Sequence, residues 1–487
     1  MEMITKAVAV AAAFCFWGGQ MLERFNAFLW GVPVLGLILG TGVLLSLGTG
    51  FVQVRLLPAA FREFWGRLRR RDSGFRALCT ALAATVGTGN IAGVAGAIAI
   101  GGPGAVFWMW VSAFFGMAVK FAESVLSVRY REPDGRAGPM YIIRKGLKER
   151  WHWLAYLYSF FGIIAAFGVG NTAQVNAVVT ALEATGVSHG FGVGLGFLLA
   201  LLVSWMVRGG AGKIAGAAEV LVPVVGGAYV MLCIGALVLC RDRIGVAIAG
   251  ILRGAFAPEA VTGGVVGSMM ATLRIGVSRG TFTNEAGMGT AAIAHGSAGI
   301  EPVRQGLMGI MEVFLDTIVI CTLTALVILT GGIAIPYGKA AGSELTAAAL
   351  GVSFGPWVRA ALCGFLALFA LATILGWSFY AGRCAEFLLG RISWKWFGLC
   401  QGAAVVLGLF LKTGTVWTMA ELFNGLMAIP NLIAILILRT EVKSLMNVDS
   451  VSAFVVSYKR GDIHEKKHDL SDPGADASLR MSGGTCS

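Results

Sequence analysis

The sequence contains little charge. Only 13% of its 487 residues are Asp, Glu, Lys or Arg, about half the share found in soluble globular proteins. Hydrophobic residues make up 57%, and the mean hydropathy is +0.78. A chain with so few charges cannot cover a water-facing surface, so we expect a membrane protein. At roughly 20 residues per span, its length has room for ten to twelve transmembrane helices.

Paired cysteines are absent as well, which argues against a disulfide framework and a zinc site. The nine cysteines are scattered singly, without a C-x-x-C pair. The match to the zincin pattern H-E-x-x-H at 464–468 stands in a charged tail, with no apolar helix face and no obvious third ligand. We interpret it as part of a solvated tail rather than as a zinc site.

Two G-x-S-x-G matches, at 276–280 and 351–355, could indicate the nucleophile elbow of a serine hydrolase. That elbow needs a strand, a turn and a helix, together with a later histidine. His295 is the one histidine between His189 and the tail, which leaves no credible catalytic triad. The abundance of glycine, with 69 residues, explains the matches.

Long apolar segments and basic loops predict the topology. Arginines between 55 and 76, and a second basic loop at 129–150, are placed in the cytoplasm by the positive-inside rule. The segment 1–26 is then expected outside the cytoplasm, and the polar tail 440–487 is expected to be cytoplasmic and disordered. The eleven predicted helices are 27–52, an interrupted helix around 83–102, 104–128, 151–184, 191–207, 215–239, an interrupted helix at 265–295, 306–330, 357–389, 394–411 and 416–438.

Glycines interrupt two of these helices. The first break is GTGN at 87–90, within AATVGTGNIAGVAGAIAIGG, and the second is RGTFTNEAGMG at 279–289. Glycine lets the backbone leave helical geometry, which frees N–H and C=O groups for a ligand. Each break opens a run of about five spans, and the second run is inverted relative to the first, as in transporters with inverted repeats. We therefore predict an all-α transporter domain over 27–439, with repeats at about 75–240 and 262–439 and one additional N-terminal helix.

The first break also fits the dinucleotide-binding pattern G-x-G-x-x-G/A, as GTGNIA. That motif follows a β-strand and precedes a ribose-binding acid by about twenty residues. Here the upstream segment 78–84 is not β-branched, and the downstream position holds the apolar run 106–110, VFWMW. We reject the nucleotide interpretation.

Five acidic residues fall within the apolar segments, where each costs a few kcal/mol unless it faces protein or water. They are Glu219, Glu285, Glu312, Asp316 and Glu421. Two interpretations stay open: they coordinate an ion, or they form buried pairs with Arg274, Arg279 or Arg383 that hold helices together. We expect none of the acids to contact the substrate directly.

Polar residues on otherwise apolar helices add candidates for a site. They are Asn171, Gln174 and Asn176 on 151–184, and Thr373 with Trp377 on 357–389. Each alone is typical of hydrogen bonding between helices. Together with the two breaks they predict a small polar chamber lined by Trp377, Phe282 and Met288, which suits a compact ligand with charged groups and little side chain.

Four motifs in this order resemble the signatures of the alanine/glycine:cation symporter family. They are GTGNIAGVAGAIAIGGPGAVFWMW (87–110), GNTAQVNAV (170–178), SRGTFTNEAGMGTAAIAH (278–295) and ATILGWSFYAG (372–382). The resemblance spans about 27–439. It implies a leucine-transporter-like fold in the cell membrane and sodium-driven uptake of alanine or glycine, and sometimes of D-alanine.

The resemblance also implies roles for individual residues. Thr88 and Gly89 would present backbone to the substrate carboxylate, and Asn90 would bridge the substrate and the ion. The pocket would be completed by Gln174, Phe282, Thr283, Met288, Thr373, Ile374 and Trp377. A sodium ion would lie among the Ala83 and Val86 carbonyls, Asn90 and the helix bearing Thr373.

A zwitterion in the membrane needs an anion site and a cation site, which half-helix ends supply at up to roughly 2 kcal/mol each. The expected ligands are an amino acid, Na⁺ and the lipid bilayer; no cofactor, nucleic acid or obligate protein partner is implied. Proton coupling, a larger substrate such as glutamine, a channel, and a membrane-embedded enzyme using Glu285 or Asp316 remain as alternatives.

Overall fold

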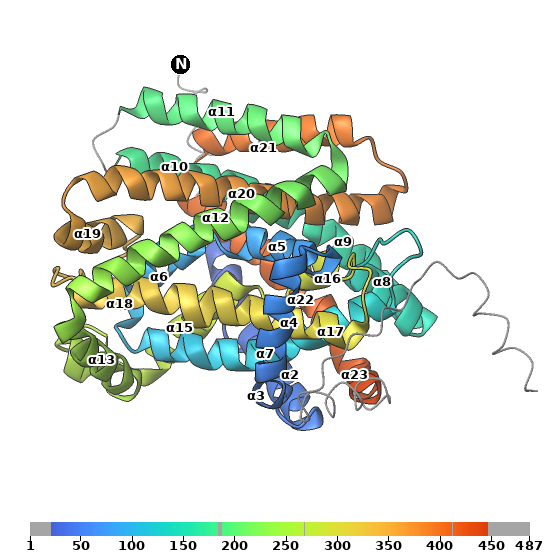
Figure 1. The fold of residues 1–487 in the computed structure, drawn as a ribbon, viewed down its shortest axis with the longest axis horizontal. Helices are drawn as coiled ribbons and strands as arrows, with labels where there is room; N and C mark the ends of the chain where they lie inside the picture. Colours follow the sequence, from blue (N-terminus) through green and yellow to red (C-terminus); the bar gives the residue numbers. More distant parts are fainter. Residues whose placement is uncertain (1–20, 184–187, 267, 412, 447–487) are drawn as a thin grey trace, which may run out of the picture. The chain divides into compact units, whose positions relative to one another are not determined.

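The computed structural model describes residues 21–183, 188–266, 268–411 and 413–446. Within these ranges the chain forms helices and no β-strand (Figure 1). Most of the predicted segment 1–26, nearly all of the predicted tail and the H-E-x-x-H match lie outside the described residues.

The first half of the chain carries the first interrupted helix. In order, its elements are α2 (Val32–Gly48), α3 (Val52–Arg55), α4 (Leu57–Arg70), α5 (Ser73–Thr85), η1 (Thr88–Asn90), α6 (Ala92–Gly101), α7 (Ala105–Arg129), α8 (Pro139–Gly146), η2 (Glu149–Trp151), α9 (Trp153–Ala165), η3 (Ala166–Thr172), α10 (Ala173–Glu183), α11 (His189–Val207), α12 (Gly210–Leu239), η4 (Arg241–Arg243), α13 (Ile244–Phe256) and α14 (Pro258–Thr262).

The second half carries the second interrupted helix. Its elements are α15 (Met269–Asn284), α16 (Thr290–His295), α17 (Pro302–Val313), η5 (Phe314–Cys321), α18 (Thr322–Thr330), α19 (Ser343–Phe354), α20 (Trp357–Leu389), α21 (Trp394–Phe410), α22 (Thr413–Ile437) and α23 (Arg439–Met446). The segments η3 and η5 are π-helical turns that continue their neighbouring α-helices.

The predicted helices are all present as helical segments. Seven described runs are long and apolar enough to cross a membrane, and two bent pairs raise this number to nine in the described chain. The other two predicted spans are α21, which is shorter, and the broken run 269–295. Eleven membrane crossings therefore remain a prediction.

Several boundaries differ from the prediction: α12 begins at Gly210 rather than at 215, and the first helix differs at both ends. The first helical run is Met21–Gly48 rather than 27–52. It ends early because Gly50 and Phe51 adopt positive φ angles of 64° and 53°, which no α-helix accommodates. A new short helix, α3, then begins at Val52.

Corresponding helices of the two halves pack against each other. Helix α7 packs on α17, α11 packs on α21, and α9 and α10 both pack on α20. Thus the second, third and fourth spans after the first break contact the spans that hold the same places after the second break. The broken helices and α20 enclose the interior of this bundle.

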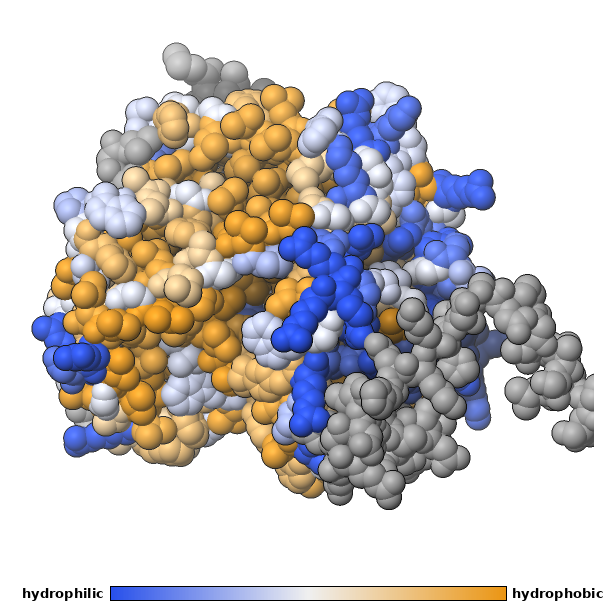
Figure 2. Space-filling view, in the orientation of Figure 1, coloured by the Kyte–Doolittle hydropathy of each residue, from blue (hydrophilic) through white to orange (hydrophobic). Residues whose placement is uncertain are grey.

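The surface separates apolar from basic side chains. Helix α12 exposes Val220, Val224, Met231 and Val238, each at least 60% accessible. Figure 2 shows hydrophobic side chains across the face formed by α11 and α12, and hydrophilic ones over α4. Figure 1 draws α4 across the direction of α17, with which it is in contact. These features are those of a multi-pass membrane protein with a basic amphipathic helix at one end of its spans.

Candidate functional site

The first break lies between α5 and α6, whose axes differ by 59°. Gly87 is fully extended, so its N–H cannot bond to the preceding turn and instead donates to Asn90 Oδ1 at 2.9 Å. The other end of the same side chain, Asn90 Nδ2, donates to Asp316 Oδ1 on η5 at 2.6 Å. Asn90 therefore holds the break in shape and ties it to the second half of the chain.

The second break, 285–289, lies between α15 and α16. Glu285, Gly287 and Gly289 all have positive φ angles, of 54°, 90° and 80°. The N–H groups of Gly287 and Gly289 donate to Glu123 Oε1 on α7, each at 3.1 Å. Asn431 on α22 donates to the same oxygen at 2.7 Å. A buried carboxylate thus stabilises backbone that the break leaves unpaired.

The two breaks meet at a small cavity with about 20 Å³ of free space. It is lined by Ala84, Thr85, Gly87, Thr88, Gly89, Val169, Gln174, Phe282, Thr283, Glu285, Thr373 and Trp377. At its wall, the Thr88 hydroxyl donates to Gln174 Oε1 at 2.9 Å. Seven of the ten predicted substrate-contacting residues therefore lie together, although they come from four separate segments.

Glycines set how closely α20 approaches the cavity. A Cβ at Gly87 would collide with Thr373 Oγ1, and a Cβ at Gly170 on η3 would collide with Trp377 Cβ. Only a residue without a side chain allows these contacts. Thr373 and Trp377 reach the cavity for this reason.

Three side chains in the lining carry a buried polar atom without a partner in the described chain. They are Glu285 Oε2, Thr373 Oγ1 and Trp377 Nε1. An unsatisfied buried polar group costs about 1–3 kcal/mol. Such atoms are expected where a ligand supplies the missing hydrogen bonds.

Three predicted residues are not brought to this cavity. Asn90 is 1% exposed, and its amide is used by Gly87 and Asp316. Met288 and Ile374 are both fully buried but do not line the cavity. Of the predicted sodium ligands, Ala83 and Val86 are buried at the end of α5, where the last carbonyls of a helix lack helical partners.

The structure answers the question of the intramembrane acids one by one. Glu421 pairs with Arg279 at 3.3 Å, as one interpretation predicted, and Glu219 pairs with Arg76 at 2.8 Å. Asp316 bonds to Asn90 and to the Thr317 hydroxyl. Glu285, which was expected to stay away from the substrate, lines the cavity instead.

Glu312 belongs to a buried network that the sequence interpretation missed. Lys120 Nζ lies 2.7 Å from Glu312 Oε1, and His295 Nε2 lies 3.0 Å from Glu312 Oε2. All three side chains are fully buried. Lys120 and Glu123 interrupt the apolar stretch 104–128, and this intramembrane charge was the signal that could have found the network.

A wider vestibule of about 340 Å³ adjoins the cavity and shares Thr88, Gly89 and Phe282 with it. Arg279, Glu421 and Glu344 also line this vestibule. Thr88, Gly89 and Phe282 therefore form the boundary between the vestibule and the cavity, and these charged side chains lie on the vestibule side.

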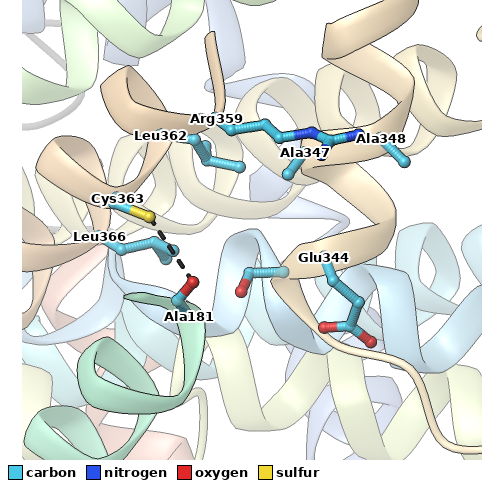
Figure 3. Close-up of a pocket in the computed structure, with 9 residues that line it drawn as sticks. Ala181, Glu344, Ala347, Ala348, Arg359, Leu362, Cys363 and Leu366 are labelled. Carbon is cyan, nitrogen blue, oxygen red and sulfur yellow. Dashed lines mark hydrogen bonds between the residues drawn. The ribbon is translucent and has the colours of Figure 1, made fainter. Parts of the chain in front are cut away.

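A further pocket of about 200 Å³ lies between α10, α19 and α20 (Figure 3). Arg359 extends along one side of it, and the Cys363 thiol lies 3.7 Å from the Ala181 carbonyl oxygen. None of the predicted site residues lines it. Its lining is mostly apolar and lacks the exposed backbone of the two breaks.

The sequence matches a known protein family over most of its length. The model of the sodium:alanine symporter family matches residues 16–461. The chain belongs to the sodium:alanine symporter family. It is 40% identical over 436 residues to the sodium/alanine symporter AgcS of Methanococcus maripaludis, covering 86% of this chain and 94% of AgcS. It is 37% identical over 437 residues to the probable sodium/glutamine symporter GlnT of Bacillus subtilis, covering 86% and 89%.

The fold has a counterpart among solved structures. MhsT in complex with L-phenylalanine matches with a TM-score of 0.53 at 13% identity, covering 80% of this chain and 98% of MhsT. This likeness confirms the predicted leucine-transporter-like fold. The sodium:alanine symporter family is a family of transporters, as the sequence predicted. In agreement, the G-x-S-x-G match at 276–280 lies inside α15, and no strand precedes GTGNIA in the described chain.

Proposed function

We propose that this family member imports small neutral amino acids, alanine or glycine and also D-alanine, together with Na⁺ by alternating access. The observation that carries the proposal is the small cavity at the two helix breaks. Its lining offers backbone from both breaks and three buried polar atoms without partners in the described chain. Polar side chains and unpaired backbone at two helix breaks suit a zwitterion.

The substrate carboxylate would accept hydrogen bonds from the backbone of Thr88 and Gly89, with Gln174 beside them. The start of a helix favours negative charge. Thr283, Thr373 and Trp377 would complete the polar wall, and Phe282 would close the cavity toward the vestibule. Met288 and Ile374 would support this wall from behind.

Na⁺ would bind to the carbonyls of Ala83 and Val86 and to the Thr373 hydroxyl, close to Asn90. These are hard oxygen ligands, which suit an alkali cation. The buried Thr373 Oγ1 has no partner in the described chain, which supports this assignment. Asn90 would act by holding the break in shape, since both ends of its amide are already bonded.

Two alternatives concern the ion and the size of the substrate. Proton coupling would make uptake independent of sodium at constant pH. A larger substrate such as glutamine is favoured by the 37% identity to GlnT. The aromatic rings of Phe282 and Trp377 in the cavity lining favour the smaller amino acids.

The binding role of Gln174 can be tested with Gln174→Ala. This variant removes the acceptor of the Thr88 hydroxyl, and a buried unpaired hydroxyl costs about 1–3 kcal/mol. We expect labelled alanine to bind at least tenfold more weakly to the purified variant, with normal membrane insertion. The control is Gln53→Ala, the same change at a buried position that does not line the cavity. Equal alanine affinity in the two variants would show that the binding site lies elsewhere.

A further inference from the structure

Glu285 differs from every other residue in the cavity lining. It is the one ionisable side chain among the described residues that line the cavity. It is 3% exposed, and its Oε2 has no hydrogen-bond partner in the described chain. A buried carboxylate oxygen in this state calls for a positively charged or hydrogen-bond-donating ligand.

The backbone at Glu285 is unusual as well. Its φ angle of 54° is in the left-handed region, which costs a non-glycine residue about 1–3 kcal/mol. The other two residues of this break with positive φ angles, at 287 and 289, are glycines, which adopt such angles freely. A glycine at 285 would relieve this strain, so the turn itself does not require the Glu285 side chain.

The charged groups nearby already have partners. Lys120 pairs with Glu312 at 2.7 Å, and Arg279 pairs with Glu421 at 3.3 Å. No ion pair within 4.0 Å joins Glu285 to a cation in the described chain. The described residues also contain no cluster of three His, Cys, Asp or Glu side chains that could hold a metal ion.

We propose that Glu285 receives the α-ammonium group of the transported amino acid. This inference rests on the proposed function, because it assumes that the cavity binds a zwitterion. The carboxylate of the ligand would face the backbone of the first break at Thr88 and Gly89, and its ammonium would face the carboxylate of the second. One negative side chain then matches one ammonium, so that substrate binding neutralises a buried charge.

The assignment predicts how the site discriminates between ligands. A carboxylic acid without an amino group, such as propionate, leaves Glu285 unpaired and adds a second negative charge to the cavity. A site that hydrogen-bonds a substrate group rejects analogues that lack it far more strongly than it rejects a change of one methylene. Glu285 is therefore the residue that selects amino acids over simple organic acids.

The test measures binding of labelled alanine to purified protein at saturating Na⁺, with propionate as competitor. If alanine does not bind to the wild type, the labelled ligand is whichever of the twenty amino acids does. Glu285→Gln should weaken amino-acid binding roughly ten- to hundredfold, the effect of losing one charged hydrogen bond in a dry site. It should also narrow the gap in affinity between the amino acid and propionate. Glu259→Gln, the same change at an exposed position on α14, should bind like the wild type.

Three results would overturn the assignment. The first is unchanged amino-acid affinity in Glu285→Gln. The second is a rise only in the Na⁺ concentration needed for half-maximal binding, which would make Glu285 a cation ligand. The third is a wild-type protein that binds none of the twenty amino acids, which would remove the proposed function as well. If Glu285→Gln is not monodisperse, Glu285→Asp serves as the test. This variant should bind the amino acid more weakly than the wild type but still prefer it to propionate. Unchanged amino-acid affinity in Glu285→Asp would contradict the assignment.

Discussion

Phe282 lines both the cavity and the vestibule, as Thr88 and Gly89 do, and it has the largest side chain of the three. Trp377, which is 1% exposed, forms part of the cavity wall on α20. The free space of about 20 Å³ holds about one water molecule, so side chains must move before an amino acid enters. The two aromatic rings then limit the size of the substrate side chain. The bulk of the Phe282 and Trp377 rings would make the site selective for small amino acids.

Phe282→Ala should therefore admit larger amino acids. We expect leucine to compete with labelled alanine in this variant but not in the wild type. The gain should be modest, because a methylene or two is worth about 1–3 kcal/mol in an apolar pocket. Met288→Ala is the matched comparison: Met288 does not line the cavity, so leucine should still be excluded. Leucine that already competes with the wild type as well as alanine does would disprove the size limit.

Two π-helical segments carry polar side chains into the centre of the bundle. The segment η3 ends at Thr172, just before Gln174, and η5 contains Asp316. A π turn widens a helix locally and is frequent at functional sites. Asp316 within η5, and Gln174 on α10 just after η3, each supply a hydrogen-bond partner to the first break.

The contact between η3 and α20 should be sensitive to a single methyl group. Gly170→Ala places a Cβ against Trp377 Cβ, so the two helices must separate, at a cost of about 1–3 kcal/mol. We expect a lower thermal stability in detergent and weaker alanine binding. The control is Gly194→Ala on α11, where a Cβ would have no neighbour within 4 Å. Equal stability of the two variants would show that this contact is not tight.

Elements of this protein were largely predictable, because hydropathy and glycine mark them directly. The bounds 357–389 were predicted as observed for α20, and both breaks lie where glycine interrupts an apolar run. Partners across the bundle were not predictable in the same way. The contacts of Glu123 with Gly287 and of Lys120 with Glu312 join residues more than 160 positions apart. Such pairs depend on how the helices pack, and a single sequence does not show which helices are in contact.

Orientation in the membrane concerns the whole molecule and remains a prediction. The two basic loops lie at one end of the bundle, because the segment after α16 contacts both: Gly299 N–H donates to Ser73 Oγ, and Arg131 donates to the Ala298 carbonyl. Tyr130 after α7 also donates to Glu441 on α23. We propose that this end is cytoplasmic, with the N-terminus outside and the tail 440–487 inside. Burial and the bond to Glu441 raise the pKa of Tyr130 to about 12, so this contact should persist at physiological pH.

Cysteines introduced at Arg69 and Arg144 in a cysteine-free background should report this orientation. Both side chains are exposed and lie in the arginine-rich parts that the positive-inside rule places in the cytoplasm. Each should react only with reagents that enter the cell, whereas a cysteine at the exposed Glu259 should react with impermeant reagents. Labelling of Arg69→Cys from outside would invert the topology.

The most direct measurement for the whole account is uptake of labelled alanine into proteoliposomes with and without an inward sodium gradient. Because a neutral zwitterion that moves with Na⁺ carries net charge, an inside-negative potential supplies about 2.3 kcal/mol per 100 mV. At 100 mV this energy supports an inside-to-outside concentration ratio of the amino acid of roughly 1.5 decades. We predict saturable, sodium-dependent accumulation that rises with the potential. Equal uptake in sodium-free buffer at constant pH would contradict sodium coupling, and flux without saturation or counterflow would indicate a channel.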